Sequence, residues 1–438
     1  MADVIPDLLA RELVAQSTDL TALRAELADG PVTAYAGFDA TGPSLHAGHL
    51  VQMLVLRRLQ LGGHRPIVLA GGATGMIGDP GGRSTERVLL TPELVQENVV
   101  ALRPQLERFV EMGGGPTGGQ LVNNLEWTAG LSTIDFLRDV GKHFPVNQML
   151  ARDTVATRLA GDGLSYTEFS YMLLQSLDYL ELHRAYGCRL QIGGSDQWGN
   201  IISGVDLVRR VERHTVHALT TPLLTSSAGE KLGKSTGGGR LWLDPALTSP
   251  YSFYQQWLNV EDALVGSLLR RLTLLDLDEV TALEQETRER PQARAGQRAL
   301  ARSLTTIVHG AEEVTRAEQA AAALFGQGEL AALPEDVLAA ALAEAGVVQV
   351  TVGGAVGSGL PPLAELLRLT GLTESTSAAR RLVAEGGVSV SNVRATDALA
   401  PPDASALLHG RWLVLRRGRR AVAGVRVVSG ERGAQPLA

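Results

Sequence analysis

The chain has 438 residues, 45% of them apolar and 20% charged, and its formal net charge at pH 7 is −7. This length allows about two to four domains, no apolar run approaches the ~18 residues of a membrane span, and the acidic balance excludes a protein that coats nucleic acid without selection. The first residues carry acids where a secretory signal carries bases, and Cys188 is the single cysteine. We therefore expect a cytoplasmic protein without disulfides or a membrane anchor.

Short β-branched runs alternate with helical patterns over the first half of the chain. Strand-like runs are VTAYAGF (32–38), PIVLAGG (66–72), QLVNN (120–124) and CRLQIGG (188–194), with helix-like segments from His49 and from about Pro92 to Met112 between them. Such alternation predicts an α/β fold with a doubly wound, mostly parallel, Rossmann-like sheet. Ligands of such sheets bind at the carboxyl ends of the strands.

The first motif, YAGFDATGPSLHAGH (35–49), places His46 and His49 in the first turn of a predicted helix. Their spacing puts both imidazoles on one side, and we expect the free N–H groups of the helix start to face a phosphate oxygen. Gly48 between them leaves room for a nucleotide. The alternative is that one histidine only caps or packs, and HxGH also marks nucleotidyltransferases.

The glycine-rich segment GGATGMIGDP (71–80) looks like the dinucleotide fingerprint of short-chain dehydrogenases and sugar epimerases. Those enzymes need a Tyr four residues before a Lys, because the ammonium lowers the pKa of the phenol. Lysine is rare in this chain, and the residues four before Lys142, Lys231 and Lys234 are Arg138, Ser227 and Glu230. The missing Tyr–Lys pair argues against a dehydrogenase.

A helix predicted over 167–182 carries Tyr171, Gln175 and Asp178 on one stripe, at i, i+4 and i+7. Leu174 and Leu182 border this polar stripe, which favours a semi-buried pocket over the alternative of an ordinary wet helix face.

The close lysine pair lies in SAGEKLGKST (227–236), whose Gly and Ser content is typical of a mobile loop. Two ammonium groups there can close over a polyphosphate and stabilise the charge on leaving pyrophosphate. An ordinary surface loop is the alternative, although nearly every other base is arginine. Nothing in the sequence predicts a role for Lys142.

The C-terminal part of the chain changes character twice. Helical spacing predominates from 248 to 325, and the nearly uncharged VVQVTVGGAVGSGLPP (347–362) has the composition of a linker. Residues 361–438 then hold 11 arginines against 6 acids, five of these arginines in RWLVLRRGRR, which indicates a phosphate-binding strand edge. We predict a catalytic domain (1–225), a helical domain with the lysine loop (226–330), a linker (331–360) and a small α+β RNA-binding domain (361–438).

HxGH followed by KxGKS on a doubly wound sheet is the motif pair of class I aminoacyl-tRNA synthetases. Over nearly its whole length the chain resembles the bacterial tyrosyl-tRNA synthetases, through YAGFDATGPSLHAGH, GGATGMIGDP, FLRDVGKHFPVNQM, TEFSYMLLQ, LQIGGSDQWGN, KLGKS and TSPYSFYQQW. The resemblance implies that tyrosine and ATP form tyrosyl-adenylate and pyrophosphate, and that tyrosine then passes to the terminal ribose of its tRNA. It also implies a homodimer with an insertion of the catalytic domain at the interface.

The resemblance further implies roles for single residues. The tyrosine phenol would bind Tyr35 and Asp178, and its ammonium Asp79, Tyr171 and Gln175. ATP would bind Gly37, Asp39, Gly194, Asp196, Gln197, Leu224 and Lys234. Thr41, His46 and His49 would stabilise the α-phosphate under attack by the tyrosine carboxylate, while Arg83, Arg87, Lys231 and Lys234 hold pyrophosphate with Mg²⁺. The implied mechanism needs no tightly bound cofactor and no protein-bound metal.

The C-terminal segment LAELLRLTGLTESTSAARRLVAEGGVSVSNVRA resembles a small RNA-binding module named after a ribosomal small-subunit protein. The tRNA-binding residues expected from charge and resemblance are Arg380, Arg381, Arg411, Arg416, Arg417, Arg419 and Arg420. Asn392-Val393 replaces the usual Asn-Gly, so we expect a distorted hairpin there. The alternative function is that of a catalytically lapsed homologue that only binds RNA.

Overall fold

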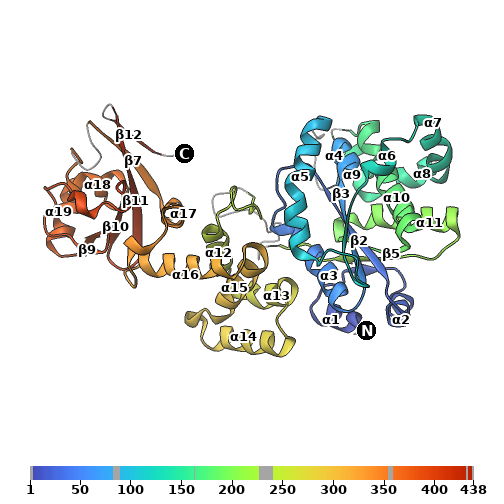
Figure 1. Ribbon diagram of the computed structural model, residues 1–438, viewed down its shortest axis with the longest axis horizontal. Helices are drawn as coiled ribbons and strands as arrows, with labels where there is room; N and C mark the ends of the chain where they lie inside the picture. The colour runs from blue at the N-terminus through green and yellow to red at the C-terminus, as the bar shows by residue number, and fades with distance from the viewer. Residues whose placement is uncertain are drawn as a thin grey trace. The chain divides into compact units, whose positions relative to one another are not determined.

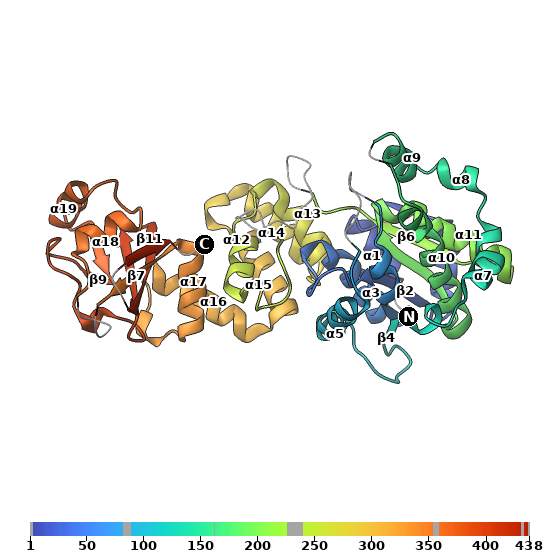
Figure 2. The same cartoon turned by 90° about the horizontal axis from the view of Figure 1, so that it is seen from above.

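The computed structural model describes residues 3–81, 89–161, 163–225, 240–353, 359–430 and 433–436. The chain forms two compact units, one of residues 1–248 and 257–308 and one of residues 249–256 and 309–438. Figure 1 shows both units with labels on helices and strands where there is room, and Figure 2 shows the same elements from above. No helix among the described residues is long and apolar enough to cross a membrane.

The first unit contains a six-stranded sheet in the order β1-β6-β5-β2-β3-β4. Its strands are β1 (Gln16–Ser17), β2 (Thr33–Asp39), β3 (Arg65–Gly71), β4 (Gln120–Asn123), β5 (Cys188–Gly194) and β6 (His217–Thr221). Neighbouring strands run parallel except at the edge, where β1 pairs antiparallel with β6. The inner strands are buried on both faces, which explains why their sequences are almost continuous apolar runs.

Helices cover both faces of this sheet, as the doubly wound prediction requires. In Figure 1 helices α3 and α5 lie on one side of the strands and α10 and α11 on the other. The helices up to residue 212 are α1 (Val4–Ala10), α2 (Leu20–Asp29), α3 (Leu50–Leu61), α4 (Gly72–Ile77), α5 (Pro92–Phe109), α6 (Leu125–Thr128), α7 (Thr133–Asp135), α8 (Val146–Leu150), α9 (Asp153–Leu159), α10 (Tyr166–Tyr186) and α11 (Trp198–Glu212). Helix α5 ends three residues before the predicted Met112.

The chain reverses its direction of travel across the sheet between β2 and β5. It first proceeds outward from β2 through β3 to β4, and it then crosses to the other side of β2 to form β5 and β6. At such a switch point the loops after the two central strands diverge, which leaves a crevice at their carboxyl ends. The fold therefore predicts a ligand site after Asp39 and Gly194.

The predicted helical segment follows the sheet. It comprises α12 (Pro250–Leu258), α13 (Asp262–Leu272), α14 (Leu277–Glu289), α15 (Ala295–His309) and α16 (Ala311–Leu324). In α13 and α15 the buried side chains recur at helical spacing, with Leu268 and Leu272 on one helix and Leu300 and Leu304 on the other. These apolar stripes bury α13 and α15 within the first unit.

The second unit is built on another six-stranded sheet, in the order β12-β7-β11-β10-β8-β9. Its further elements are α17 (Glu335–Ala345), β7 (Val347–Val352), α18 (Leu363–Leu369), α19 (Thr376–Ala384), β8 (Val388–Val390), β9 (Val393–Arg394), β10 (Trp412–Arg417), β11 (Ala421–Ser429) and β12 (Gly433–Pro436). Buried residues of α18, such as Leu366 and Leu367, pack with Leu413, Leu415 and Val425 of the sheet. This is the predicted small α+β fold.

Two expectations about this unit differ from the structure. Residues 331–360, expected as a linker, contain α17 and β7, and β7 pairs parallel with β11 because VVQVTV is rich in β-branched residues and fits a sheet. The hairpin turn is Ser391-Asn392 and not Asn392-Val393: Val390 pairs with Val393, and both turn residues have positive φ, 45° and 66°. Asn tolerates this left-handed conformation, so the two-residue turn forms without Gly.

Candidate active site

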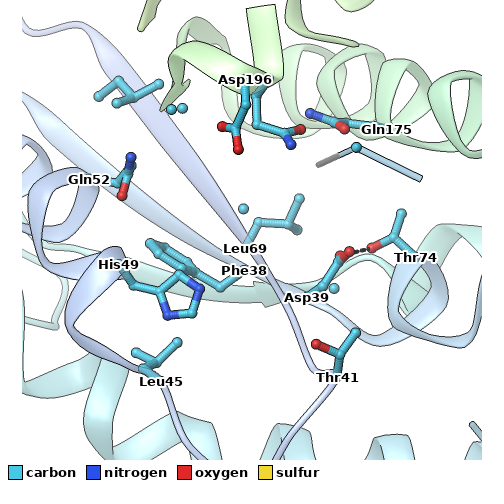
Figure 3. A pocket seen from close by; sticks show the side chains of 18 of the residues that line it. Phe38, Asp39, Thr41, Leu45, His49, Gln52, Leu69, Thr74, Gln175 and Asp196 are labelled. Carbon is cyan, nitrogen blue, oxygen red and sulfur yellow. Dashed lines mark hydrogen bonds between the residues drawn. The ribbon is translucent and has the colours of Figure 1, made fainter. Parts of the chain in front are cut away.

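A cavity of about 520 Å³ opens at the carboxyl ends of β2 and β5, where the chain reverses direction. Figure 3 shows Asp39, His49, Gln175 and Asp196 around it. The sequence-predicted residues that line it are Tyr35, Gly37, Asp39, Thr41, His46, His49, Tyr171, Gln175, Asp178, Gly194, Asp196, Gln197 and Leu224. Residues from four distant parts of the sequence thus meet in one cavity.

One end of the cavity is closed and holds Tyr35 and Asp178, which are 1% and 3% exposed. The Asp178 carboxylate accepts hydrogen bonds from Asn124 Nδ2 at 3.0 Å and from Trp127 Nε1 at 2.9 Å. The Tyr35 hydroxyl is buried and has no hydrogen-bond partner among the described residues. A buried hydroxyl without a partner is costly, so this end is suited to a ligand that brings a hydrogen-bonding group.

Burial controls the protonation of this end. It raises the pKa of Asp178 to about 7, against the opposing effect of the hydrogen bonds from Asn124 and Trp127. Burial, followed by the nearby Asp178 carboxylate, raises the pKa of Tyr35 well above its ordinary value. Tyr35 is therefore a neutral phenol near pH 7, and Asp178 is divided between its two forms.

The wall beyond this end is made of residues that were predicted to serve two different substrates. Tyr171 donates from its hydroxyl to Asp39 Oδ2 at 2.8 Å, and Thr74 Oγ1 donates to Asp39 Oδ1 at 2.7 Å. Asp79, two residues beyond the end of α4, accepts from Gln197 Nε2 at 2.5 Å. Tyrosine-site and ATP-site residues are thus hydrogen-bonded to each other, as expected where two substrates must react.

The HxGH segment forms a 3₁₀ turn (Ala47–His49) ahead of α3, and its two imidazoles stack at 3.9 Å between ring centroids. The backbone N–H of His46 donates to His49 Nδ1, and that of Gly48 donates to His46 Nδ1, each at 3.1 Å. The N–H groups of Ala47 and His49 donate to the carbonyls of Leu241 and His46.

This arrangement corrects one expectation. The backbone N–H groups of the turn are occupied by the histidines and a neighbouring segment, so they do not face a phosphate. Gly48 lines the cavity, and a Cβ there would lie 2.9 Å from His46 Cε1, so glycine also makes room for the His46 ring. Because both Nδ1 atoms accept, a neutral imidazole at either position carries its proton on Nε2.

His49 stays uncharged at neutral pH. Burial, followed by His46 and then by Arg240, lowers its pKa well below the ordinary value. His49 can therefore donate a hydrogen bond from Nε2–H but brings no positive charge to the site.

Four predicted catalytic residues, Arg83, Arg87, Lys231 and Lys234, lie outside the described residues. Several residues of the site were not predicted from the sequence. Asn124 and Trp127 donate hydrogen bonds to Asp178. The others line the cavity: Phe38, Gly42, Ser44, Leu45, Gln52, Leu69, Gly71, Thr74, Gly81, Gln191, Ile192, Gly193, Ile201, Pro222, Leu223 and Arg240. Asn124 directly follows β4, and Trp127 lies in the four-residue helix α6. Neither residue belongs to a periodic pattern that a sequence could show.

The predicted tRNA-binding arginines of the second unit fall into two groups. Arg417, Arg419 and Arg420 are exposed at the β10–β11 turn, and the N–H of Gly418 in this turn donates to the carbonyl of Gly387. Gly387 comes three residues after the end of α19, which carries the exposed Arg380 and Arg381. The turn therefore meets the end of α19, and these five arginines belong to one region of the unit.

Arg411 and Arg416 differ from that group. Arg411 lies at the other end of β10 and forms an ion pair with Glu335 at 2.6 Å, while Arg416 Nε donates to Ser389 Oγ at 3.2 Å. Glu335 also accepts from Trp412 Nε1 at 2.9 Å. Arg411 is thus engaged in joining β10 to α17, which weakens its assignment to tRNA.

Comparison with known proteins gives the chain relatives over nearly its whole length. Residues 27–326 match the family of tRNA synthetases class I (W and Y), and residues 352–423 match the tyrosine–tRNA ligase SYY-like C-terminal domain. The chain is 59% identical over 429 residues, 98% of this chain and 100% of the relative, to a tyrosine–tRNA ligase of Mycobacterium sp. (strain JLS). It is 58% identical over 422 residues, 96% of this chain and 98% of the relative, to the tyrosine–tRNA ligase of Mycobacterium tuberculosis.

Comparison with solved structures also gives a tyrosyl-tRNA synthetase. A C-terminally truncated mitochondrial tyrosyl-tRNA synthetase of Aspergillus nidulans matches with a TM-score of 0.66 and 30% identity, over 72% of this chain and 92% of that chain.

Proposed function

The chain belongs to the tyrosine–tRNA ligases among the class I tRNA synthetases, and from that premise we propose how its cavity carries out the reaction. The enzyme activates tyrosine with ATP, forming tyrosyl-adenylate and pyrophosphate, and then transfers the tyrosyl group to the 3′-terminal adenosine of its tRNA. In the first step a tyrosine carboxylate oxygen attacks the α-phosphorus, and the bond to the pyrophosphate oxygen breaks. The protein contributes positioning and electrostatic stabilisation, and no side chain acts as a nucleophile.

Tyrosine enters with its phenol toward Tyr35 and Asp178. The single observation that carries this assignment is the unpartnered, buried hydroxyl of Tyr35 beside the Asp178 carboxylate. A tyrosine phenol would satisfy both groups, whereas phenylalanine would leave both unpaired. Discrimination of about 10⁵-fold is already a known property of this very enzyme family, so the magnitude is not a new prediction. Tyr171 and Gln175 line the cavity, and Asp79 is hydrogen-bonded to the lining residue Gln197; these three residues would hold the ammonium.

ATP occupies the open end. Gly37, Asp39, Gly194, Asp196, Gln197 and Leu224 would surround its adenosine, and Thr41, His46 and His49 would donate to the α-phosphate. The backbone N–H groups that donate to both Nδ1 atoms, and so direct Nε2 toward a ligand as the protonated nitrogen, support this role. Arg83, Arg87, Lys231 and Lys234 are proposed to hold pyrophosphate on sequence grounds.

Mg²⁺ is proposed as the counter-ion of ATP. The described residues contain no group of three or more His, Cys, Asp and Glu side chains that could hold a metal ion. The ion would therefore be carried by phosphate oxygens, whose charge it partly neutralises when bound.

The proposal for tRNA rests on the arginines of the second unit. Arg380 and Arg381 on α19 and Arg417, Arg419 and Arg420 at the β10–β11 turn would contact phosphates, with Arg411 and Arg416 in supporting positions. Five substitutions to Gln in the exposed group should weaken tRNA charging strongly and leave tyrosine activation unchanged, because activation does not involve tRNA.

A homodimer is supported by apolar side chains that the first unit leaves exposed between residues 134 and 166. They are Ile134, Leu137, Val146, Leu150, Leu159 and Tyr166, with Ile134 and Tyr166 each 69% exposed. Exposed apolar residues in such number favour contact with a second copy. Sedimentation should give a dimer, and a paired Ile134→Glu, Val146→Glu variant should give monomers; a monomeric wild type would refute this assignment. The cytoplasm is the proposed compartment.

Tyrosine-dependent ATP–pyrophosphate exchange tests the function as a whole. Purified, folded protein should exchange label between pyrophosphate and ATP only when tyrosine is present. A folded protein that charges no tRNA and shows no exchange would instead be a lapsed homologue that binds RNA.

A further inference from the structure

Arg240 is a residue of the cavity to which neither the sequence motifs nor the family resemblance gave a role. Among the described residues that line the cavity, it carries the only guanidinium or ammonium group. The residue is exposed, and no carboxylate of the described part of the chain pairs with it within 4 Å. An arginine that faces a cavity without an acidic partner is available to an anionic ligand.

The segment that carries Arg240 is fixed to the HxGH turn. Trp242 pairs with His46 in an antiparallel bridge, flanked by hydrogen bonds of 2.9 Å from Ala47 N–H to the Leu241 carbonyl and from Leu243 N–H to the Leu45 carbonyl. The position of the Arg240 backbone is therefore set by the same turn that orients the two catalytic histidines.

The side chain of Trp242 in turn supports the guanidinium. Arg240 Cζ lies 5.3 Å from the centre of the Trp242 ring, within range of a cation–π contact. The backbone of Trp242 is also held, since its N–H donates to Thr248 Oγ1 at 3.1 Å. A guanidinium that rests on an aromatic face loses less conformational freedom when it binds a ligand.

Arg240 acts at the histidine end of the cavity, not at the phenol end. Its positive charge contributes to lowering the pKa of His49, which requires proximity, while it is not among the causes that shift the pKa of Tyr35 or Asp178. The histidine end is also where the α-phosphate is proposed to bind. An anion that extends from the histidines toward solvent would reach the exposed Arg240.

We propose that Arg240 is a further phosphate-binding residue, whose guanidinium contacts the β- and γ-phosphates of ATP and then the leaving pyrophosphate. This inference rests on the proposed function of the cavity. A planar guanidinium can donate two parallel hydrogen bonds to phosphate oxygens. Because those phosphates are charged before and after the reaction, Arg240 stabilises bound ATP and bound pyrophosphate alike, and it acts mainly on their affinities.

The test is ATP–pyrophosphate exchange with the full-length protein at saturating tyrosine, with ATP and pyrophosphate varied in turn. Arg240→Gln should raise the KM for ATP and for pyrophosphate by about 5- to 20-fold, the loss of one charge-assisted contact at an open site. The KM for tyrosine should stay within about twofold, and kcat should change less than the KM for ATP. Arg103→Gln is the matched control: Arg103 is an exposed arginine of α5, paired with Glu107 at 3.5 Å and outside the cavity.

Two results would overturn the proposal. One is a KM for ATP within about twofold of wild type in Arg240→Gln, and the other is an equal rise in the KM for tyrosine, which would mean that Arg240 only shapes the cavity. Absence of exchange in the wild-type protein would contradict the proposed function instead, so the two failures are distinguishable.

A double-mutant cycle tests the support by Trp242. Trp242→Leu alone should raise the KM for ATP by about two- to fivefold, since it removes the aromatic face. Combined with Arg240→Gln it should add nothing further, because the guanidinium it supports is gone. Fully additive effects would contradict the anchoring role.

Discussion

The two ends of the cavity would recognise their proposed ligands by opposite means. At the phenol end, Tyr35 and Asp178 are almost completely buried, and Asp178 is held by Asn124 and Trp127. At the proposed phosphate end, His49 is a neutral imidazole, and Arg240, the one arginine or lysine among the described residues that line the cavity, is exposed. A small neutral group is selected by burial, because a wrong ligand leaves polar atoms unpaired, whereas a highly charged group is held by several cations that remain accessible to it.

This difference predicts where substitutions act. Changes at the phenol end should alter the selection and affinity of tyrosine, and changes at the phosphate end should alter rate and ATP affinity.

The largest effect is expected at the phosphate end. Lys234→Ala should slow tyrosyl-adenylate formation by about 10²- to 10³-fold, because it removes charge stabilisation from the pyrophosphate leaving group, while the KM for tyrosine stays nearly unchanged. Single-turnover adenylate formation measures the step directly. Lys142→Ala, an exposed lysine outside the cavity, is the control and should behave like wild type. If Lys234→Ala abolished tyrosine binding, the proposal that the two ends bind tyrosine and phosphate separately would be wrong.

Next in size is the loss of selectivity at the phenol end. Tyr35→Phe should reduce the preference for tyrosine over phenylalanine by about 10- to 100-fold, since one of the two unpaired groups is gone. The ratio of kcat/KM for the two amino acids in exchange measures it. Tyr179→Phe is a matched control: its ring lies edge-on to that of Tyr35 at 5.3 Å, but its hydroxyl already donates to the His217 carbonyl at 2.7 Å. That variant should lose stability and keep selectivity.

The pH dependence of tyrosine binding follows from Asp178. Its pKa of about 7 lies above the ordinary value of 3.8. The carboxylate, which accepts a hydrogen bond from the tyrosine phenol, therefore forms as the pH rises through 7. Tyrosine affinity should increase up to about tenfold per pH unit below 7 and level off above it. Asn124→Ala removes a hydrogen bond that lowers this pKa, and it should move the midpoint to higher pH. Equilibrium dialysis from about pH 5.5 to about pH 8.5 measures both, and a flat profile would refute the assignment.

The raised pKa of Asp178 also makes the stability of the ligand-free protein depend on pH, in the direction opposite to that of tyrosine affinity. Between pH 3.8 and 7 the folded protein keeps the Asp178 proton and the unfolded chain has released it. Raising the pH through this window therefore lowers the free energy of unfolding in the absence of tyrosine.

The smallest expected effect is that of Trp127→Phe. It keeps an aromatic ring and removes the Nε1–H that donates to Asp178, which should raise the KM for tyrosine about two- to fivefold and leave the KM for ATP unchanged. An equal change in both constants would show that the two ends are not independent.

Local patterns in the sequence predicted the fold, the histidine turn and the polar stripe of α10, and the family resemblance implied the other predicted cavity residues. Alternating apolar runs mark the strands, and the i, i+4, i+7 spacing brings Tyr171, Gln175 and Asp178 to one stripe of α10. The details that were wrong depend on partners distant in sequence. The N–H of Ala47 was expected to be free, but it donates to Leu241, about 200 residues away.

Residues without periodicity were missed for the same reason. Asn124 and Trp127 belong to the site because they donate hydrogen bonds to Asp178, which is about 50 residues later in the chain. Arg240 belongs to it because the neighbouring Trp242 pairs with His46. The strand β7 lies in the predicted linker. Its partner β11 is about 75 residues later in the chain, so no local pattern indicates the pairing, and the glycines that follow β7 are typical of a linker.

Cys188 has a practical consequence. It is the only cysteine of the chain, it is fully buried at the start of β5 beside Thr33, and burial raises its pKa to about 12. Thiol reagents react with the thiolate, so we expect Cys188 of the native protein not to react with maleimides or mild oxidants near neutral pH. A fluorophore or spin label attached through one engineered surface cysteine would therefore report from that position alone, without first removing the natural thiol.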